Sequence, residues 1–236
     1  MKILAIDTTA KTATAALTEN ESLIALTVLN TPNTHSVTLL PMINGLLSGA
    51  SLTVKDIDLL ACSAGPGSFT GVRIGTSAIK GLAFADNKPC IGVSSLEALA
   101  MNVTEDGIAC PVMDARRNQV YNALFRCKNG KLTRLTPDRV LSASELACEL
   151  EAEQDRIFIT GDGSEIAKKA LAEKNIALPH EVLRYHNAYN VALLGYEAYL
   201  SATEEEKKNF THEKLCPTYL RMSQAERERL EREKKE

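Results

Sequence analysis

The chain has 236 residues, of which 44% are hydrophobic, which is enough for one large domain or two small ones. Its net charge is −3, with 27 Lys and Arg residues against 30 Asp and Glu residues, so the overall field does not attract nucleic acid. No apolar run approaches the roughly 20 residues that a membrane helix needs, and no signal peptide precedes the first strand pattern, so a cytoplasmic protein is expected.

The first hundred residues have the pattern of a mixed sheet with two helices. Strands are predicted at 2–7, 12–17, 22–29, 55–62 and 89–93. The first three are joined by tight turns, which indicates an antiparallel meander. Helices are predicted at 35–48 and 67–85, so the order is β-β-β-α-β-α-β. This order predicts a ribonuclease-H-like layout.

The sharpest turn signal is the run A-G-P-G-S-F-T-G-V-R-I-G at 64–75. Ser68 follows the Gly-Pro-Gly turn and is placed to cap the second helix. Such a loop could cradle a phosphate, but it lacks the Lys-Ser/Thr ending of a P-loop and the G-x-G-x-x-G spacing, so a plain turn is favoured. Gly71, Gly75 and Gly81 each cost the helix roughly 1 kcal/mol relative to alanine. We therefore expect another element to pack very close to it.

The second half of the chain repeats the pattern of the first. Residues 6–17 align without a gap on 113–124, and each stretch has an apolar residue, an Asp, a turn and a strand ending Ala-Leu. The G-P-G-S turn at 65–68 has a counterpart in G-D-G-S at 161–164. We therefore predict an α/β protein of two duplicated ribonuclease-H-like domains, whose mixed sheets are flanked by helices.

The first domain is predicted over 1–102, completed by the C-terminal segment 210–236, and the second, reduced domain over 103–209. Later elements are a strand at 157–160, helices at 164–174 and 188–200, a charged break at 203–209 and a charged tail from 223. The tail is interpreted as a solvated helix or a frayed end.

Neither cysteines nor histidines show metal-ligand spacing. The six cysteines are scattered and none falls in C-x-x-C, which favours reduced, buried thiols. His180, His186 and His212 have no partner that spacing would reveal, and His35 is assigned a capping or interface role. Ser68 has no identifiable base, so a hydrolase triad is not supported. We predict no metal site and no catalytic residue.

Several motifs together resemble the bacterial TsaB (YeaZ) family. They are I-D-T-T at 6–9, H-S-x-x-L-L-P at 35–41, the glycine motif at 64–75, G-V-S-S-L-E at 92–97 and P-x-Y-L-R at 217–221. The resemblance is close over the first hundred residues and looser beyond them. It implies the fold of the actin-like ATPase and sugar-kinase superfamily, which also consists of two linked ribonuclease-H-like domains.

This resemblance implies a non-catalytic subunit in the synthesis of N6-threonylcarbamoyladenosine next to the tRNA anticodon. The implied partners are TsaD, which performs the transfer, and the ATPase TsaE; tRNA would be reached only through the complex. An exposed two-helix patch would favour a homodimer when the partner is absent, because large apolar patches rarely stay solvated. In TsaD an H-x-x-x-H motif supplies two metal-binding imidazoles just after the strand that matches 89–93. The stretch 93–99 of this chain, V-S-S-L-E-A-L, holds no histidine, so it cannot build that metal site.

The partner interface is expected on the two helices of the first domain, packed against the same helices of a structural relative as a four-helix bundle. Small residues would let a partner helix approach closely, and apolar residues would supply contact area. The predicted interface residues are His35, Leu39, Ile43, Leu46, Phe69, Thr70, Gly71, Arg73, Ile74, Gly75 and Ser77.

An ATP-using kinase or ATPase is the alternative function, and a protease is a weaker third. Asp7, Thr8 and Thr9 would then bind nucleotide, with Asp7 holding a water or Mg²⁺ near a phosphate; the favoured interpretation is that Asp7 caps a turn. We predict no cofactor, with ATP or ADP at a joint between subunits as the alternative. Arg73 either pairs with a partner's carboxylate or phosphate or forms a salt bridge on its own surface.

Overall fold

A five-stranded sheet forms the first domain in the computed structural model, which describes residues 1–171 and 175–221. Its strands are β1 (Lys2–Asp7), β2 (Ala13–Glu19), β3 (Ser22–Leu29), β4 (Leu59–Gly65) and β5 (Cys90–Ser94). The strand order is β3-β2-β1-β4-β5, with β1, β4 and β5 parallel and the β1–β2–β3 meander antiparallel. The predicted meander and mixed sheet are therefore confirmed.

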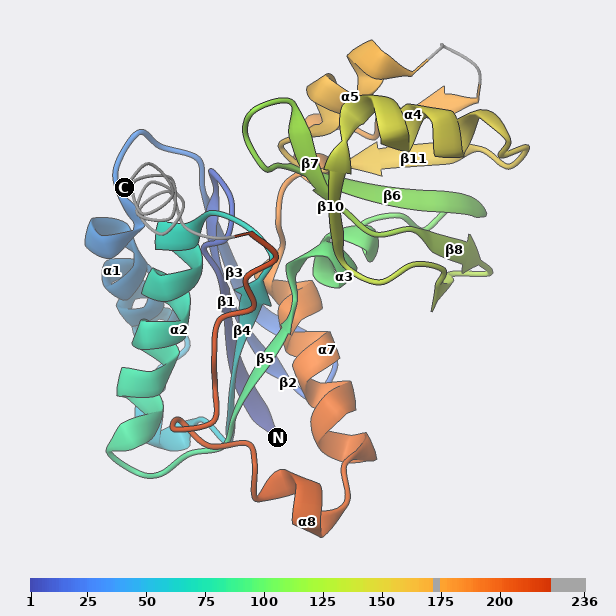
Figure 1. Ribbon diagram of the computed structural model, residues 1–236. Helices are drawn as coiled ribbons and strands as arrows, with labels where there is room; N and C mark the ends of the chain where they lie inside the picture. Colours follow the sequence, from blue (N-terminus) through green and yellow to red (C-terminus); the bar gives the residue numbers. More distant parts are fainter. Residues whose placement is uncertain (172–174, 222–236) are drawn as a thin grey trace, which may run out of the picture.

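Two helices cover one face of this sheet. α1 (His35–Gly49) and α2 (Phe69–Phe84) lie side by side in Figure 1, and their inner sides share one core with the strands. Fully burying a Leu or Ile side chain contributes roughly 1.5–3 kcal/mol, so this core is the main support of both helices. Its members include Leu4, Ile6, Leu17, Leu39, Ile43, Leu46, Leu60 and Ile79.

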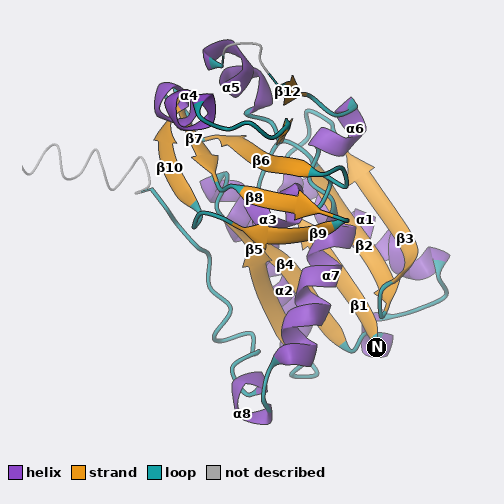
Figure 2. Cartoon of the chain, turned by 90° about the vertical axis from the view of Figure 1, so that its right-hand side faces the viewer, coloured by secondary structure: helices purple, strands orange, loops and turns teal. Residues whose placement is uncertain are grey.

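The opposite face of the first sheet is covered by α7 (Ala188–Ser201), which crosses it in Figure 2. Val191 and Ala192 are fully buried against strand residues of β1 and β4. Asn190 on the same helix donates to the carbonyl of Ala98 over 2.8 Å. The predicted range 103–209 assigned this helix to the second domain, whereas it packs on the first sheet. The sequence pattern predicts a helix here but does not say which sheet it covers.

A C-terminal strap, defined here as residues 210–221, returns along the first domain. The N–H of Cys90 donates to the carbonyl of Phe210, and the N–H of Thr218 donates to that of Ala64. Leu215 is buried in the core below α1 and α2. The described part of the predicted segment 210–236 thus contacts the first domain, and residues 222–236, including the charged tail, lie outside the described residues.

The second domain holds a mixed sheet of seven strands. They are β6 (Gly107–Asp114), β7 (Gln119–Asn122), β8 (Phe125–Lys128), β9 (Lys131–Arg134), β10 (Arg139–Ser142), β11 (Ile157–Thr160) and β12 (Ile176–Ala177). α4 (Ala143–Glu151) and α5 (Ser164–Ala170) pack on one face, and α3 (Ser95–Ala100) packs on β6 from the other side. Two short helices remain, α6 (Glu181–Arg184) and α8 (Glu204–Lys207).

The duplication predicted from the sequence is visible in matched local geometry. β1 pairs in parallel with β4, as β6 does with β11. Asp7 and Asp114 end the corresponding strands, and each accepts a hydrogen bond from the N–H two residues on, over 2.8 Å and 2.7 Å. Gly65 and Gly161 follow with φ of +119° and +98°, a region that side chains disfavour. The two-copy interpretation of the sequence is confirmed.

Most predicted elements agree with the structure to within two residues, and three differ by more. The strand predicted at 55–62 begins at Leu59, because Val54–Asp56 forms a short 3-10 turn closed by a Thr53–Asp56 capping box. The helix predicted at 164–174 ends at Ala170, and 172–174 lie outside the described residues. The charged break predicted at 203–209 contains α8, and Thr203 caps the N-terminus of that helix.

The expectation of buried thiols holds for four of the six cysteines. Cys62, Cys90, Cys110 and Cys127 are buried and unbridged, and Cys148 and Cys216 are exposed. Burial raises the pKa of Cys90 to about 11 and that of Cys110 to about 12, so these two thiols remain protonated at neutral pH.

Candidate functional site

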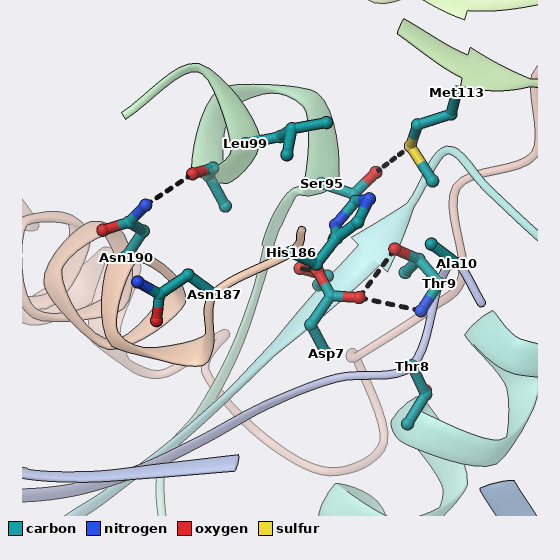
Figure 3. A network of polar contacts seen from close by, with 12 residues as sticks. Asp7, Thr8, Thr9, Ala10, Ser95, Leu99, Met113, His186, Asn187 and Asn190 are labelled. Carbon is teal, nitrogen blue, oxygen red and sulfur yellow. Dashed lines mark hydrogen bonds and ion pairs between the residues drawn. The ribbon is translucent and has the colours of Figure 1, made fainter. Parts of the chain in front are cut away.

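The turn after β1 is the point where both domains, α1 and α2 meet. Asp7 is buried at the end of β1, and its Oδ1 accepts hydrogen bonds from the N–H and the hydroxyl of Thr9 over 2.8 Å and 2.7 Å. Its Oδ2 accepts from the hydroxyl of Ser63 on β4 and lies 2.9 Å from Nδ1 of His186. Figure 3 shows the carboxylate between Thr9 and the His186 ring.

His186 lies just before α7, so it joins the second domain to the first. Burial alone would raise the pKa of Asp7, but the charge and hydrogen bond of His186, with Ser63 and Thr9, outweigh it and lower that pKa. Burial opposes protonation of His186, yet the charge and hydrogen bond of Asp7, with a contribution from Asp162, raise its pKa. Each group thus favours the charged form of the other.

Asp7 makes the contacts expected of the turn-capping role. It caps the turn through Thr9, and both of its oxygens are in use. Thr8 is also buried, and its hydroxyl donates to the carbonyl of Gly71 on α2 over 2.7 Å. Asp7, Thr8 and Thr9 are therefore directed into the protein's own contacts. Among the described residues no group of three or more His, Cys, Asp or Glu side chains is placed to hold a metal ion.

A cavity of about 710 Å³ lies beside this turn, between the two domains. It is lined by the glycine loop and the first residues of α2, by the turn after β6, and by the end of the strap. Lys11, Arg116 and Arg221 contribute positive charge, and Asp114 and Asp162 contribute negative charge. The sequence disfavoured a phosphate-binding role for the glycine loop. The loop nevertheless borders this cavity together with basic side chains.

The outward sides of α1 and α2 form a second candidate surface. In Figure 1 the strap runs along one side of α2, and no other described helix or strand lies on these outward sides. Val37 and Leu40 on α1 are 66% and 51% exposed, and Phe84 at the end of α2 is 70% exposed. Thr70, Arg73 and Ser77 also lie on this outer side, and Ile74 is half-buried beside it. We refer to the outer sides of α1 and α2 as the helix face.

The predicted interface residues divide between this surface and the core. Leu39, Ile43 and Leu46 are 2%, 1% and 6% exposed and belong to the core under α1 and α2. They therefore do not supply apolar surface to a partner, because the sheet already covers them. On α1 the exposed apolar side chains are their neighbours, Val37 and Leu40.

Gly71 and Gly75 also face inward, which corrects the expectation that a partner helix approaches them. A Cβ at Gly71 would lie 2.0 Å from the carbonyl oxygen of Thr8, and one at Gly75 would lie 2.5 Å from its hydroxyl. The close neighbour predicted from the glycines is therefore the turn after β1. Gly81, by contrast, has open space around its Cβ position.

Arg73 and His35 make specific contacts within the chain. Nε of Arg73 donates to the hydroxyl of Tyr219 on the strap over 2.8 Å, and its guanidinium lies 4.0 Å from the centre of the Phe69 ring, on which Tyr219 stacks. A ring nitrogen of His35 lies 2.8 Å from the carbonyl of Ala10, so the start of α1 is tied to the turn after β1. A salt bridge on its own surface was one of the two alternatives for Arg73; the ion pairs of the described residues do not include one, and Arg73 bonds to Tyr219 instead.

Sequence reasoning missed His186 and Tyr219 as parts of these sites. His186 stands 179 residues from Asp7, and no spacing rule connects positions that far apart. Tyr219 belongs to the P-x-Y-L-R motif, which marked the segment but gave no partner for its ring. No helix of the described residues combines the length and apolar character needed to span a bilayer.

The family model described as TsaD, tRNA N6-adenosine threonylcarbamoyltransferase, matches residues 30–229 of the chain. The chain is 34% identical over 241 residues to the tRNA threonylcarbamoyladenosine biosynthesis protein TsaB of Bacillus subtilis, covering 99% of this chain and 100% of that protein. It is 30% identical over 238 residues to TsaB of Haemophilus influenzae, covering 94% of each.

Solved structures show the same architecture. YeaZ from Pseudomonas aeruginosa matches with a TM-score of 0.77 and 24% identity, over 93% of this chain and 99% of that one. A second structure from the same organism, described as an uncharacterized protein with similarity to peptidase YeaZ, matches with a TM-score of 0.78 and 26% identity, again over 93% and 99%.

Proposed function

The chain belongs to the TsaB family of tRNA threonylcarbamoyladenosine biosynthesis proteins, and from this membership we propose that it is a non-catalytic subunit that binds the TsaD transferase. In this proposal it acts in the cytoplasm, with TsaE as a further component. The chain reaches tRNA only through the complex. When the transferase is absent, the same surface pairs with a second copy.

The observation that carries this proposal is the uncovered helix face. Val37 and Leu40 on α1 and Phe84 on α2 expose apolar side chains on two neighbouring helices, and of these Phe84 also makes an edge contact with His212 of the strap. Exposed apolar patches on a folded protein commonly mark sites of association. Helix pairs associate by fitting the ridges of one pair into the grooves of another. A transferase of the same fold would offer the matching pair of helices.

Two observations support a non-catalytic role. The stretch that would carry the metal-binding imidazoles runs from β5 into α3, where Ser94 instead caps α3 through the N–H of Glu97 and donates to Asp138 over 2.6 Å. Asp7, the other carboxylate considered for chemistry, is paired with His186. Neither place leaves a free set of metal ligands or a nucleophile with a base.

The proposal is tested by purifying the chain and the TsaD protein of the same organism separately and together. Each sample is assayed for transfer of threonylcarbamoyl to a tRNA transcript with an ANN-decoding anticodon, and binding is measured by calorimetry. We expect no transfer by the chain alone, a stoichiometric complex on mixing, and higher transfer by TsaD when the chain is present. Transfer by the chain alone, or no complex on mixing, contradicts the proposal.

Nucleotide binding is the second candidate function, and the interdomain cavity is the observation that favours it. The cavity combines the glycine loop with Lys11, Arg116 and Arg221. ATP or ADP bound there would meet these cations, and Asp7 would take no part because it is already paired. Equilibrium dialysis with ATP and with ADP, repeated with Arg221→Ala, tests this candidate. Equal binding by the chain and by the variant would contradict a site in this cavity.

A further inference from the structure

The charge of the helix face differs from that of the whole molecule. The chain carries a net charge of −3, yet neither α1 nor α2 contains an Asp or a Glu. Arg73 and Lys80, both on α2, are the only Lys or Arg residues of the two helices. The first acidic residue after α2, Asp86, lies 3.9 Å from the ammonium of Lys88. Arg73 is exposed and Lys80 is half-buried, so the two helices carry cations without any carboxylate of their own.

Arg73 is held in place rather than free to move away. Its Nε is bonded to Tyr219, and its guanidinium stacks on Phe69. No ion pair of the described residues involves Arg73 or Lys80. A guanidinium fixed through Nε keeps its terminal nitrogens for another acceptor, and a carboxylate matches that fork. Holding the side chain before binding lowers the conformational entropy lost on association.

We propose that the helix face selects a partner whose matching helices carry carboxylates opposite Arg73 and Lys80, and that it discriminates against a second copy of this chain. This inference rests on the proposed function and names the chemistry of the partner. Apolar side chains such as Leu40 would suit either occupant. The charges suit only an acidic partner, because a second copy brings two more cations and no acid from its own α1 and α2.

The two equilibria should respond to salt in opposite directions. Attraction between unlike exposed charges is screened as salt rises, so the complex with the acidic partner should weaken. Repulsion between like charges is screened in the same way, so self-association should strengthen. A contact made only of apolar groups would show neither response.

The test measures both equilibria on the full chain at about 50 mM and about 500 mM salt, where the Debye length falls from about 14 Å to about 4 Å. Calorimetry gives the affinity for the TsaD transferase, and sedimentation equilibrium gives self-association. Arg73→Glu is expected to weaken the transferase complex by about tenfold or more at low salt. The same change should strengthen self-association by about threefold, because each copy then offers one charge of each sign.

Lys80→Glu repeats the test at a position without the ring contacts of Arg73, and it is expected to change both equilibria in the same directions. Lys131→Glu, an exposed change of equal charge on β9, is the matched control and should alter neither. Thermal unfolding of all three confirms that each variant is folded.

Shifts of the two equilibria in the same direction, or affinities within twofold of the unchanged chain in both Glu variants, would overturn the inference. Failure of the unchanged chain to bind the transferase would contradict the proposed function instead. In that case the self-association measurements still test whether the cations of α2 disfavour pairing with a second copy.

Discussion

Nδ1 of His186 lies 2.9 Å from Oδ2 of Asp7, and the two side chains are 1% and 0% exposed. The pair joins the strand that starts the first domain to the segment that leaves the second. Removing one member of a buried ion pair leaves the other charged without a partner, which typically costs about 3–5 kcal/mol. The junction between the domains therefore depends on two residues far apart in the sequence.

His186→Ala is expected to lower the free energy of unfolding by about 3 kcal/mol or more. Asp7→Asn should have a similar effect, and the double variant should lose less than the sum of both, because the two residues share one interaction. Urea unfolding of the single and double variants measures the coupling. Additive losses would contradict a direct pair. Glu205→Gln, which removes an exposed ion pair with Lys208, is the control and should change stability by less than about 1 kcal/mol.

The contribution of this pair should depend on pH in a defined direction. The raised pKa of His186 gives stability that is fully present below about pH 6.5 and is lost as pH rises through the raised value. The lowered pKa of Asp7 gives stability that is present above about pH 3.9 and is lost as pH falls through the lowered value. The stability difference between the chain and His186→Gln should therefore be largest between about pH 4 and 6.5. A difference that grows as pH rises above 7 would contradict this assignment.

Gly71→Ala should destabilise the chain by about 1–3 kcal/mol, because the added methyl group meets the carbonyl of Thr8. Gly81 lies on the same helix, and a Cβ added there would meet nothing within 4 Å. Gly81→Ala should stabilise the chain by about 0.5–1 kcal/mol, since alanine is the better helix former. Thermal melts of the two variants give the comparison, and equal effects would mean that the turn after β1 yields at no cost.

Leu40→Asp is expected to abolish binding to TsaD without unfolding the chain, because Leu40 is exposed on α1. Ile43→Asp, one turn further on, should unfold it, because Ile43 is 1% exposed and a charge there has no partner. Leu200 on α7 is exposed to a degree comparable with Leu40, so Leu200→Asp is the control for binding. Circular dichroism and calorimetry on the same samples separate folding from binding. Unchanged affinity of a folded Leu40→Asp variant would place the interface elsewhere.

Tyr219→Ala should loosen the N-terminal end of α2 by removing both the stack on Phe69 and the bond to Arg73. Tyr219→Phe keeps the ring and loses only the hydrogen bond, so its cost should stay near 1 kcal/mol. Hydrogen exchange at the first turns of α2 measures the effect. Protection that is equal in the two variants would mean that the ring does not hold this end of the helix.

Local patterns in the sequence predicted much of the fold. The meander, both helices of the first domain and the repeat of the Asp turn and glycine loop were found from periodicity and turn residues, and the motif resemblance to the TsaB family is confirmed by the relatives. Each of these signals lies within a short window of the chain. Propensity and periodicity act over such windows, which is why they sufficed.

The candidate sites were harder to predict from the sequence because they depend on tertiary packing. The glycines of α2 showed that something lies close, but they do not say whether it is the turn at Thr8 or another molecule. Apolar spacing marked Leu39, Ile43 and Leu46 as one face of α1, and such a face is by default the one turned to the core. The partner of Asp7 could be found only once α7 was placed on the first sheet.

The strap and α7 have a consequence for synthesis on the ribosome. The first domain starts with β1, yet one face of its sheet stays open until α7 emerges, and the edge at β5 stays open until the strap does. At bacterial-type translation rates of about 5–20 residues per second, roughly 10–40 seconds separate the first strand from the helix that covers it. The second sheet is continuous in sequence and can close during that interval. A nascent chain therefore exposes an unfinished apolar sheet for most of its synthesis. A stop codon that removes the strap would leave the β5 edge of the truncated chain uncovered.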